Sequence, residues 1–517
     1  MIPRPTILHA LALLVALLML APVHAVAQNT KDAKKPASKA APAASQKTAA
    51  KKGAKNSPAK AATKAPGGTK DETIIHIIHD VSPQQLQATD EKLVGFGNRS
   101  TLSVNNPGAA TADKGIVAAR NWIKSEFERY SAACGGCLEV KTDTFIEQPK
   151  GPRDRILQPT EIQNVYAILR GTDPAQAKRI FLVTGHYDSR NSDNANTTDP
   201  APGANDDGSG TTVSLECARV LSKHRFPATI VFLTVAGEEQ GLNGSTHFAK
   251  MAKAEGWQLE GVLNNDIVGG NRTPGDTLQN FNWVRVFSEG IPAAATEADL
   301  RAIRAVGGEN DSASRQLARH IQEVNQTYSS FGKFTAKLIF RRDRFLRGGD
   351  HSAFNEQGFA AVRFTEYRED FHHQHQTPRV EKGIDYGDWP KYVNFDYLAN
   401  VARLNAATLA TLASAPAAPK AHLLTRELEN DSKIEWDAVP GAVAYDVVWR
   451  KTTDPDFPPE NAVRTAQTKV DMPDSKDNVI FGVRSVGPKG QRSLIAIPAP
   501  ERAGSPVLTP TPQPEKK

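Results

Sequence analysis

The sequence predicts an α/β fold with a mostly parallel (mixed) central sheet flanked by helices, plus a small C-terminal all-β sandwich. Strand-like runs of β-branched residues alternate with helical segments between residues 72 and 415. Polar motifs follow several of these strands directly, which is where ligands bind in open α/β sheets. Beyond residue 415 the pattern changes to short strands of alternating hydrophobicity, which is typical of a β-sandwich.

Residues 1–27 have the features of a secretory signal peptide. Arg4 precedes the apolar run from Leu8 to Leu20, and small residues around Ala25 and Ala27 offer cleavage sites. A membrane anchor is the alternative, but the apolar run is short for a span. We therefore expect cleavage, and a secreted or periplasmic protein.

Residues 28–71 are rich in lysine, alanine and proline and contain almost no large apolar residue, so we expect a disordered linker. Eleven lysines face a single acid, Asp32, within residues 28–70. Without this segment and Arg4, the net charge of +6 becomes about −5. The body of the protein is thus not basic, and we expect no nucleic-acid partner. The linker is either a solvated spacer or an arm that contacts an anionic cell surface.

The segment 72–415 carries the α/β pattern, and we expect it to be the catalytic domain. Apolar residues recur at helical spacing around residues 82–93 and 115–130, and residues 209–223 form a further expected helix. The expected strands are Val165 to Leu169, Ile180 to Thr184, Thr229 to Val235, Val262 to Val268 and Ala360 to Thr365.

Residues 416–502 are expected to form the β-sandwich, and residues 503–517 a Pro-rich tail. The order of Trp436, the Pro440-Gly441 turn and Tyr445 resembles a fibronectin type III domain. That resemblance implies either an adhesive or substrate-presenting module, or a spacer that stabilises the enzyme.

The chain has three cysteines, which is too few for a disulfide-built scaffold. In an exported protein Cys134 can form a disulfide with Cys137, which leaves Cys217 without a cysteine partner. A redox-active CxxC is the alternative reading, but it needs a surrounding βαβ context that the sequence does not show.

The first chemical motif is Gly-His186-Tyr-Asp188, directly after the strand that ends at Thr184. An imidazole nitrogen of His186 can bind a metal, and Asp188 is placed to accept the other ring N–H. A lone buried histidine is more often only hydrogen-bonded, so this motif is weak without the others.

Three carboxylate motifs follow. Asp206 lies in a Gly-rich turn before a helix, where a plain turn or a calcium loop are alternatives. Glu238 and Glu239 follow a very apolar strand, and Asp266 interrupts a strand-like run. Burying a charged carboxylate costs free energy unless a positive charge lies close to it, and a metal ion supplies that charge. One glutamate can bind metal while its neighbour removes a proton from water.

This set of nitrogen and oxygen ligands without thiolates favours a catalytic zinc site with open positions. The number of carboxylates favours two zinc ions about 4 Å apart. A second imidazole is then needed, and His372, His373 and His375 are the candidates.

In this order the motifs resemble the zinc exopeptidase family of secreted bacterial aminopeptidases, glutamate carboxypeptidase and glutaminyl cyclase. The resemblance spans residues 71–415 and implies a two-zinc exopeptidase fold. It implies that His186 binds one zinc, Asp206 bridges both, and Glu239 and Asp266 each bind one ion. Glu238 is then the general base.

The same resemblance indicates His375 as the last ligand, with His373 as the alternative, although Gln376 and Arg379 depart from the family pattern. Asp350 and His351 match a family pair that supports the site or is merely structural. Tyr367 is a candidate oxyanion donor.

The expected activity is removal of N-terminal residues from peptides by water activated between the zinc ions, that is, a metallopeptidase of aminopeptidase type. A carboxypeptidase for acidic peptides is the alternative, with Arg341, Arg342, Arg344, Arg347 and Arg363 available for a basic pocket. Glutaminyl cyclase is a further alternative, but that branch resembles a one-zinc site without the first histidine. A catalytically inactive adhesive protein is the alternative from another class.

Overall fold

The computed structural model describes residues 62–66, 70–328, 331–426 and 428–501. The expected signal peptide, most of the linker and the Pro-rich tail lie outside these residues. None of the helices within the described ranges is long and apolar enough to cross a membrane.

An eight-stranded mixed sheet forms the centre of the α/β part, in the order β2-β3-β5-β4-β6-β9-β7-β8. Strands β4, β5, β6 and β9 are neighbours and parallel. On one side β3 runs antiparallel to β5, and β2 runs antiparallel to β3. On the other side β7 runs antiparallel to β9. The bounds are β2 (Leu138–Glu147), β3 (Thr160–Leu169), β4 (Arg179–His186), β5 (Thr229–Val235), β6 (Gln258–Asn265), β7 (Trp283–Ser288), β8 (Thr335–Ile339) and β9 (Ala361–Glu366). The predicted fold class is confirmed.

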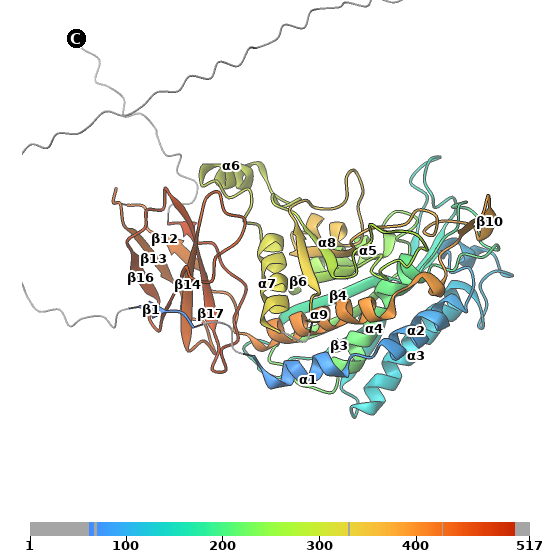
Figure 1. Cartoon of the computed structure of the whole chain (residues 1–517), viewed down its shortest axis with the longest axis horizontal. Coiled ribbons are helices and arrows are strands. Elements are labelled where there is room, and N and C mark those ends of the chain that lie inside the picture. The colour runs from blue at the N-terminus through green and yellow to red at the C-terminus, as the bar shows by residue number, and fades with distance from the viewer. Residues whose placement is uncertain (1–61, 67–69, 329–330, 427, 502–517) are drawn as a thin grey trace, which may run out of the picture. The chain divides into compact units, whose positions relative to one another are not determined.

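Helices cover both faces of this sheet (Figure 1). Alternate residues of β4 explain why, because Phe181 and Val183 pack on one face and Leu182 on the other. The first face is covered by α1 (Glu72–Asp80), α2 (Pro83–Val94), α3 (Gly115–Ala133), α4 (Ser209–Leu221), α7 (Ala313–Thr327) and α9 (Phe395–Ser414). The second face is covered by α5 (Asn243–Ala254) and α8 (His351–Glu356), and α6 spans Glu297–Ala305.

One predicted strand is shorter than expected. We expected a strand from Val262 to Val268, but β6 ends at Asn265. The backbone turns directly afterwards, since Ile267 has a φ of 59°, in the left-handed region that strands do not use. This turn takes Asp266 out of the sheet and towards the site.

The C-terminal strands form two four-stranded sheets around a core that includes Ile434, Trp436 and Val447. One sheet contains β14 (Ala444–Lys451), β15 (Ala462–Thr465) and β17 (Val479–Val486), with β1 (Thr63–Lys64) as its fourth strand. The other contains β12 (Ala421–Leu423), β13 (Ser432–Trp436), β16 (Lys469–Met472) and β18 (Ala499–Pro500).

The expectation of a disordered linker up to residue 71 is wrong for its last residues. Strand β1 (Thr63–Lys64) pairs antiparallel with β15 at the edge of the first sandwich sheet, and Ala65 donates a backbone hydrogen bond to Ala462. The physical reason is that an edge strand presents unpaired backbone groups, which a passing extended segment of almost any composition can satisfy.

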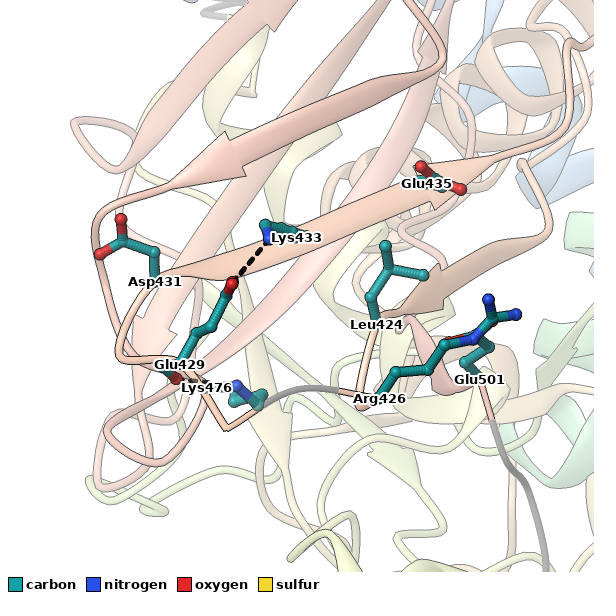
Figure 2. Close-up of a pocket in the computed structure, with 8 residues that line it drawn as sticks. All are labelled: Leu424, Arg426, Glu429, Asp431, Lys433, Glu435, Lys476 and Glu501. Carbon is teal, nitrogen blue, oxygen red and sulfur yellow. Dashed lines mark hydrogen bonds and ion pairs between the residues drawn. The ribbon is translucent and has the colours of Figure 1, made fainter. Parts of the chain in front are cut away.

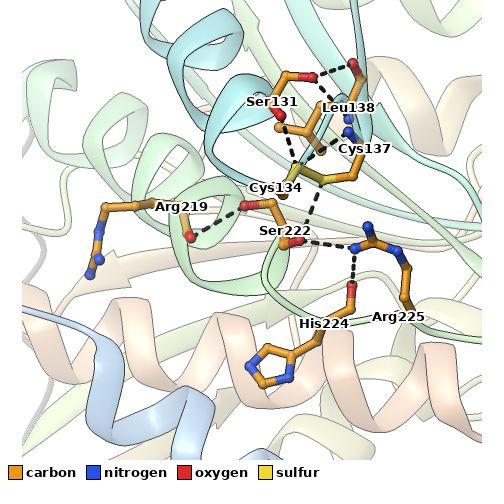
Figure 3. The surroundings of a disulfide bond; sticks show 8 residues. All are labelled: Ser131, Cys134, Cys137, Leu138, Arg219, Ser222, His224 and Arg225. Atoms are coloured by element: carbon orange, nitrogen blue, oxygen red, sulfur yellow. Dashed lines mark hydrogen bonds between the residues drawn. A yellow bond between two sulfur atoms is a disulfide. The ribbon is translucent and has the colours of Figure 1, made fainter.

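Cys134 and Cys137 form a disulfide between the end of α3 and the start of β2, a pairing that the sequence allowed but left open (Figure 3). The Cys134 sulfur also lies 3.1 Å from the carbonyl oxygen of Ser131. Cys217 is free and buried in α4. The bond therefore ties a helix end to a sheet edge and lies outside the set of residues that carry the predicted chemistry.

Candidate metal centre

The predicted ligands lie at the carboxyl ends of three adjacent parallel strands. His186 is the last residue of β4, Glu238 and Glu239 follow β5, and Asp266 follows β6. Asp206 lies in the short turn of residues 204–208 that leads into α4, and its peptide bond to Asp207 is cis. Because parallel strands end at one edge of a sheet, residues far apart in the chain converge there.

The two carboxylate oxygens of Asp206 face two different histidines. Its Oδ1 lies 3.2 Å from Nε2 of His186, which is also 4.0 Å from Oδ1 of Asp266. Its Oδ2 lies 2.8 Å from Nε2 of His375, which is 3.1 Å from Oε2 of Glu239. Asp206 is thus in position to bridge two ions.

Two sets of possible ligand atoms result, each with all atoms within 4.8 Å of one another. One set is His186, Glu238 and Asp266, and the other is Asp206, Glu239 and His375. Both are made only of imidazole and carboxylate donors, which suits a catalytic zinc site better than a structural one.

Unsatisfied buried atoms also fit a metal. Nε2 of His186 makes no hydrogen bond despite its closeness to Asp206, and Oε1 of Glu239 makes none either. His186, Asp206, Glu239 and Asp266 are all buried. Buried polar atoms without partners cost free energy, so these residues fit a bound cation.

The electrostatics of Glu238 differ from those of Asp206. Burial raises its pKa well above the usual value; His186 opposes this rise, while Asp266 and Glu239 add to it. Asp206 shows the opposite result, since His375 and His186 outweigh burial and hold its pKa well below the usual value. Glu238 therefore holds a proton more readily than Asp206 does.

Asp188 lies beside His186, as expected, but the contact differs. Nδ1 of His186 is 3.1 Å from the backbone carbonyl of Asp188 and 3.4 Å from its carboxylate. The carboxylate instead accepts hydrogen bonds from the Thr101 hydroxyl and from the backbone N–H of Glu239. Asp188 thus orients the ring through its main chain and links β4 to the glutamate pair.

The structure separates His375 from His373. His373 stacks on Tyr392 with ring centroids 3.7 Å apart, and its Nδ1 lies 3.2 Å from Asn271, away from the carboxylates. His375 reaches Asp206 and Glu239 from a backbone with a φ of 59°. Such left-handed residues are uncommon outside glycine and gather at functional sites.

The other candidates lie outside both donor sets. Asp350 is buried near His186, and burial raises its pKa to about 7. His351 lies 2.9 Å from the carbonyl oxygen of Arg342, and burial lowers its pKa to about 4. Tyr367 packs edge-on against Trp283 and does not line the cavity at the site.

Sequence reasoning missed two residues that hold the donors in place. The carboxylate of Asp388 accepts backbone hydrogen bonds from Asn205 at 2.9 Å and from Asp206 at 2.7 Å. Asp207 accepts from the backbone N–H of His186 at 3.0 Å. Asp207 stood beside Asp206 in the sequence, whereas nothing near Asp388 indicated its role.

Arg190 was also missed, although it follows His186 by only four residues. Its Nε lies 2.9 Å from Oε2 of Glu239, and its Nη2 lies 2.6 Å from Nδ1 of His375. Since arginine only donates, Nδ1 accepts here. A metal on Nε2 would require the ring proton at Nδ1, so Arg190 would then give up its contact with His375 and keep the one with Glu239.

Arg363 was predicted as part of a basic pocket but is fully buried. Its Nη1 lies 2.5 Å from Oδ2 of Asp266, which leaves Oδ1 facing His186. Arg344 and Arg347 line the cavity, whereas Arg341 lies over the Phe345 ring and Arg342 pairs with Glu356.

The cavity over the donors has a volume of about 390 Å³. Another cavity lies on the C-terminal sandwich, and there Lys433 pairs with Glu429 and Arg426 with Glu501 (Figure 2). Those charges neutralise one another, and no histidine is among the residues that line it. The chemistry therefore belongs at the strand ends of the α/β part.

An α/β fold with two nitrogen and oxygen donor sets at its strand ends defines a metal-dependent hydrolase. Residues 164–386 match the model of peptidase family M28. The chain is 42% identical to a probable zinc metalloprotease of Pyrenophora tritici-repentis over 437 residues, which cover 83% of this chain and 87% of that protein. A probable zinc metalloprotease of Pyricularia oryzae is 42% identical over 439 residues, covering 81% and 83%. The chain therefore belongs to the M28 family, and it is a zinc metallopeptidase that acts on peptides.

Solved structures show a more distant likeness. The LapA aminopeptidase of Legionella pneumophila is similar at a TM-score of 0.44 and 21% identity, covering 66% of this chain and 75% of that one. An aminopeptidase from Aneurinibacillus sp. strain AM-1 is similar at a TM-score of 0.44 and 16% identity, covering 66% and 96%. Likeness at this level carries no argument about activity.

Proposed function

We propose that the protein is a two-zinc exopeptidase, an aminopeptidase by first preference, exported from the cell. The observation that carries the two-zinc proposal is the position of Asp206 between His186 and His375, one carboxylate oxygen towards each imidazole. Its zinc ligands would be His186, Asp206 and Asp266 for one ion and Asp206, Glu239 and His375 for the other. When bound, the ions supply Lewis acidity for hydrolysis.

The remaining chemistry belongs to the chain's own residues. Glu238 is half-buried and lines the cavity, so it can take the proton of the attacking water and pass it to the leaving amine. A raised pKa suits this role, because a general base works best when its pKa lies near the working pH. Asp188 and Asp388 position the donors and do not touch the reacting atoms.

The size of the cavity supports action at a chain end. A volume of about 390 Å³ holds a residue or two, and the cavity is lined by Arg155 on one loop and by Arg344, Arg347 and Gly348 on another. A family resemblance in the motifs supports the aminopeptidase form.

The export proposal rests on residues 1–27, and the proposal of a fibronectin type III-like spacer rests on the Trp436 to Tyr445 pattern.

Glu238→Gln is the test of the assignment. The variant is expected to bind zinc nearly as the wild type does while losing most of kcat, because the amide keeps the shape but cannot accept the proton. Glu239→Gln is the matched control and should instead weaken zinc binding. Zinc content and hydrolysis of aminoacyl and dipeptide substrates are measured together; full activity of Glu238→Gln would end the assignment.

A carboxypeptidase is the second candidate, because four arginines line the cavity. A panel of peptides blocked at the amino or the carboxyl end separates the two. An aminopeptidase cleaves only peptides with a free amino terminus, and a carboxypeptidase only those with a free carboxyl terminus.

A further inference from the structure

The wall of the cavity is strongly basic once the metal-site carboxylates are set aside. Its charged residues other than the proposed ligands and Glu238 are Arg155, Arg190, Arg344 and Arg347. The four carboxylates Asp206, Glu238, Glu239 and Asp266 would face two dipositive ions, so they would not neutralise these arginines as well. A substrate therefore meets an excess of positive charge at the mouth of the site.

Two of the four arginines are already committed to the protein. Arg190 is held by Glu239 through Nε at 2.9 Å. Arg344 uses Nε on Asp343, Nη1 on Glu369 and Nη2 on the carbonyl oxygen of Gly348. These side chains shape the wall and have few donors left for a ligand.

Arg155 and Arg347 differ from them. Arg155 is exposed, its Nη1 donates to the backbone carbonyl of Glu239 at 2.6 Å, and it has no carboxylate partner within the described part of the chain. Its guanidinium thus lies beside the glutamate pair with donors to spare. Arg347 is exposed and donates to Glu369 at 2.8 Å through Nη1.

Glu369 cannot neutralise Arg347, because it is shared. Arg285 and Arg344 each lie 3.0 Å from its carboxylate as well. These cations hold the pKa of Glu369 at about 2 against the effect of burial, so this carboxylate carries its single negative charge at neutral pH. Three arginines face only two carboxylates here, Glu369 and the Asp343 that also binds Arg344, which leaves a net positive charge on the rim.

We propose that Arg155 and Arg347 form a subsite for a substrate carboxylate close to the scissile bond. This inference rests on the proposed exopeptidase function. The carboxylate has two possible sources, namely an acidic side chain at the cleaved terminus or the α-carboxylate of a dipeptide. Either would accept charge-assisted hydrogen bonds from arginine, which suits bidentate recognition.

Two matched substrate pairs distinguish the sources, measured with the zinc-loaded full-length protein. The first pair is the p-nitroanilides of glutamate and glutamine, and the second is Ala-Ala and its C-terminal amide. In each pair the charge changes and the shape is nearly kept. We expect kcat/KM to favour the charged member of one pair at least tenfold, mainly through KM, and to lose this preference as salt rises.

The variants Arg155→Gln and Arg347→Gln should each reduce that preference about tenfold. Arg153→Gln is the control, since Arg153 is exposed on the same loop and does not line the cavity. It should keep the wild-type preference. Preference for neither charged substrate, or a preference that survives in the double variant Arg155→Gln/Arg347→Gln, would overturn the inference.

A binding measurement separates this inference from the proposed function. Zinc-loaded Glu238→Gln protein is titrated calorimetrically with glutamate and glutamine, and then with Ala-Ala and its amide. Tighter binding of a charged member, lost on adding Arg155→Gln, supports the subsite even if no exopeptidase substrate is hydrolysed. Efficient hydrolysis of neutral substrates together with equal binding within both pairs refutes the subsite while the exopeptidase stands.

Discussion

The carboxylate of Asp388 is expected to control zinc affinity without touching the metal. It accepts the backbone N–H groups of Asn205 and Asp206 and so holds the turn that presents Asp206 to both histidines. In Asp388→Asn one carboxylate oxygen becomes an NH₂ group, and a donor then faces a donor. The NH₂ group that replaces Oδ1 faces the Asn205 N–H, which lies 3.0 Å from Oδ1, and the bonds to Oδ2 lose the negative charge of their acceptor.

The magnitude follows from the kind of bond. A hydrogen bond to a charged group contributes about 1.5–3 kcal/mol, which corresponds to roughly a 10- to 150-fold change in an equilibrium constant. Burial raises the pKa of Asp388 to about 7, so this magnitude applies above pH 7, where the carboxylate is charged. Loss of residues that orient metal ligands typically lowers metal affinity about 10- to 100-fold. We therefore expect zinc to bind Asp388→Asn one to two orders of magnitude more weakly.

The assay is competition for zinc with chelators of graded strength, read as zinc retained per chain. Asp385→Asn is the matched control, because Asp385 lies three residues away and pairs with Lys391 and Tyr392 outside the site. Thermal unfolding checks that both variants are folded. Zinc affinity of Asp388→Asn within twofold of wild type, or an equal loss in Asp385→Asn, would refute the positioning role.

Three further predictions concern the late histidines and two buried ion pairs. His375→Ala should lose about one zinc ion per chain whereas His373→Ala keeps both, and equal loss in the two variants would contradict the placement. Asp311→Asn should lower the free energy of unfolding in urea by about 3–5 kcal/mol, because the Asp311 side chain is only 3% exposed and pairs with Arg450 of the sandwich at 2.8 Å; a change under about 1 kcal/mol would show that this pair contributes little. Glu369 has a pKa of about 2, below its ordinary 4.5, so its stabilising effect is complete above pH 4.5 and is lost as the pH falls towards 2. At about 1.36 kcal/mol per unit, wild type should exceed Glu369→Gln by up to roughly 3 kcal/mol at pH 7 and by almost nothing near pH 2, and a pH-independent difference would be the contrary result.

Much of the fold and of the first four ligands could be predicted because both rest on local patterns. The strands β4, β5 and β6 are short apolar runs, and each is followed at once by a polar motif. Since parallel strands end at one edge of the sheet, identifying the strands was enough to bring His186, Glu239 and Asp266 together. The last residues of the linker were predicted wrongly, because β1 owes its structure to the open edge of β15 and not to its own composition.

The sequence by itself determined the class of fold and the order of the candidate metal ligands along the chain. Only the tertiary structure decided which late histidine faces Asp206, since two residues of a loop can reach different places and the left-handed backbone of His375 turns its ring towards that carboxylate. It also brought in Asp388 and Arg155, which lie in loops distant in sequence from the motifs whose residues they contact. Local patterns encode where a strand ends, but which loops meet above it depends on the packing of the whole domain.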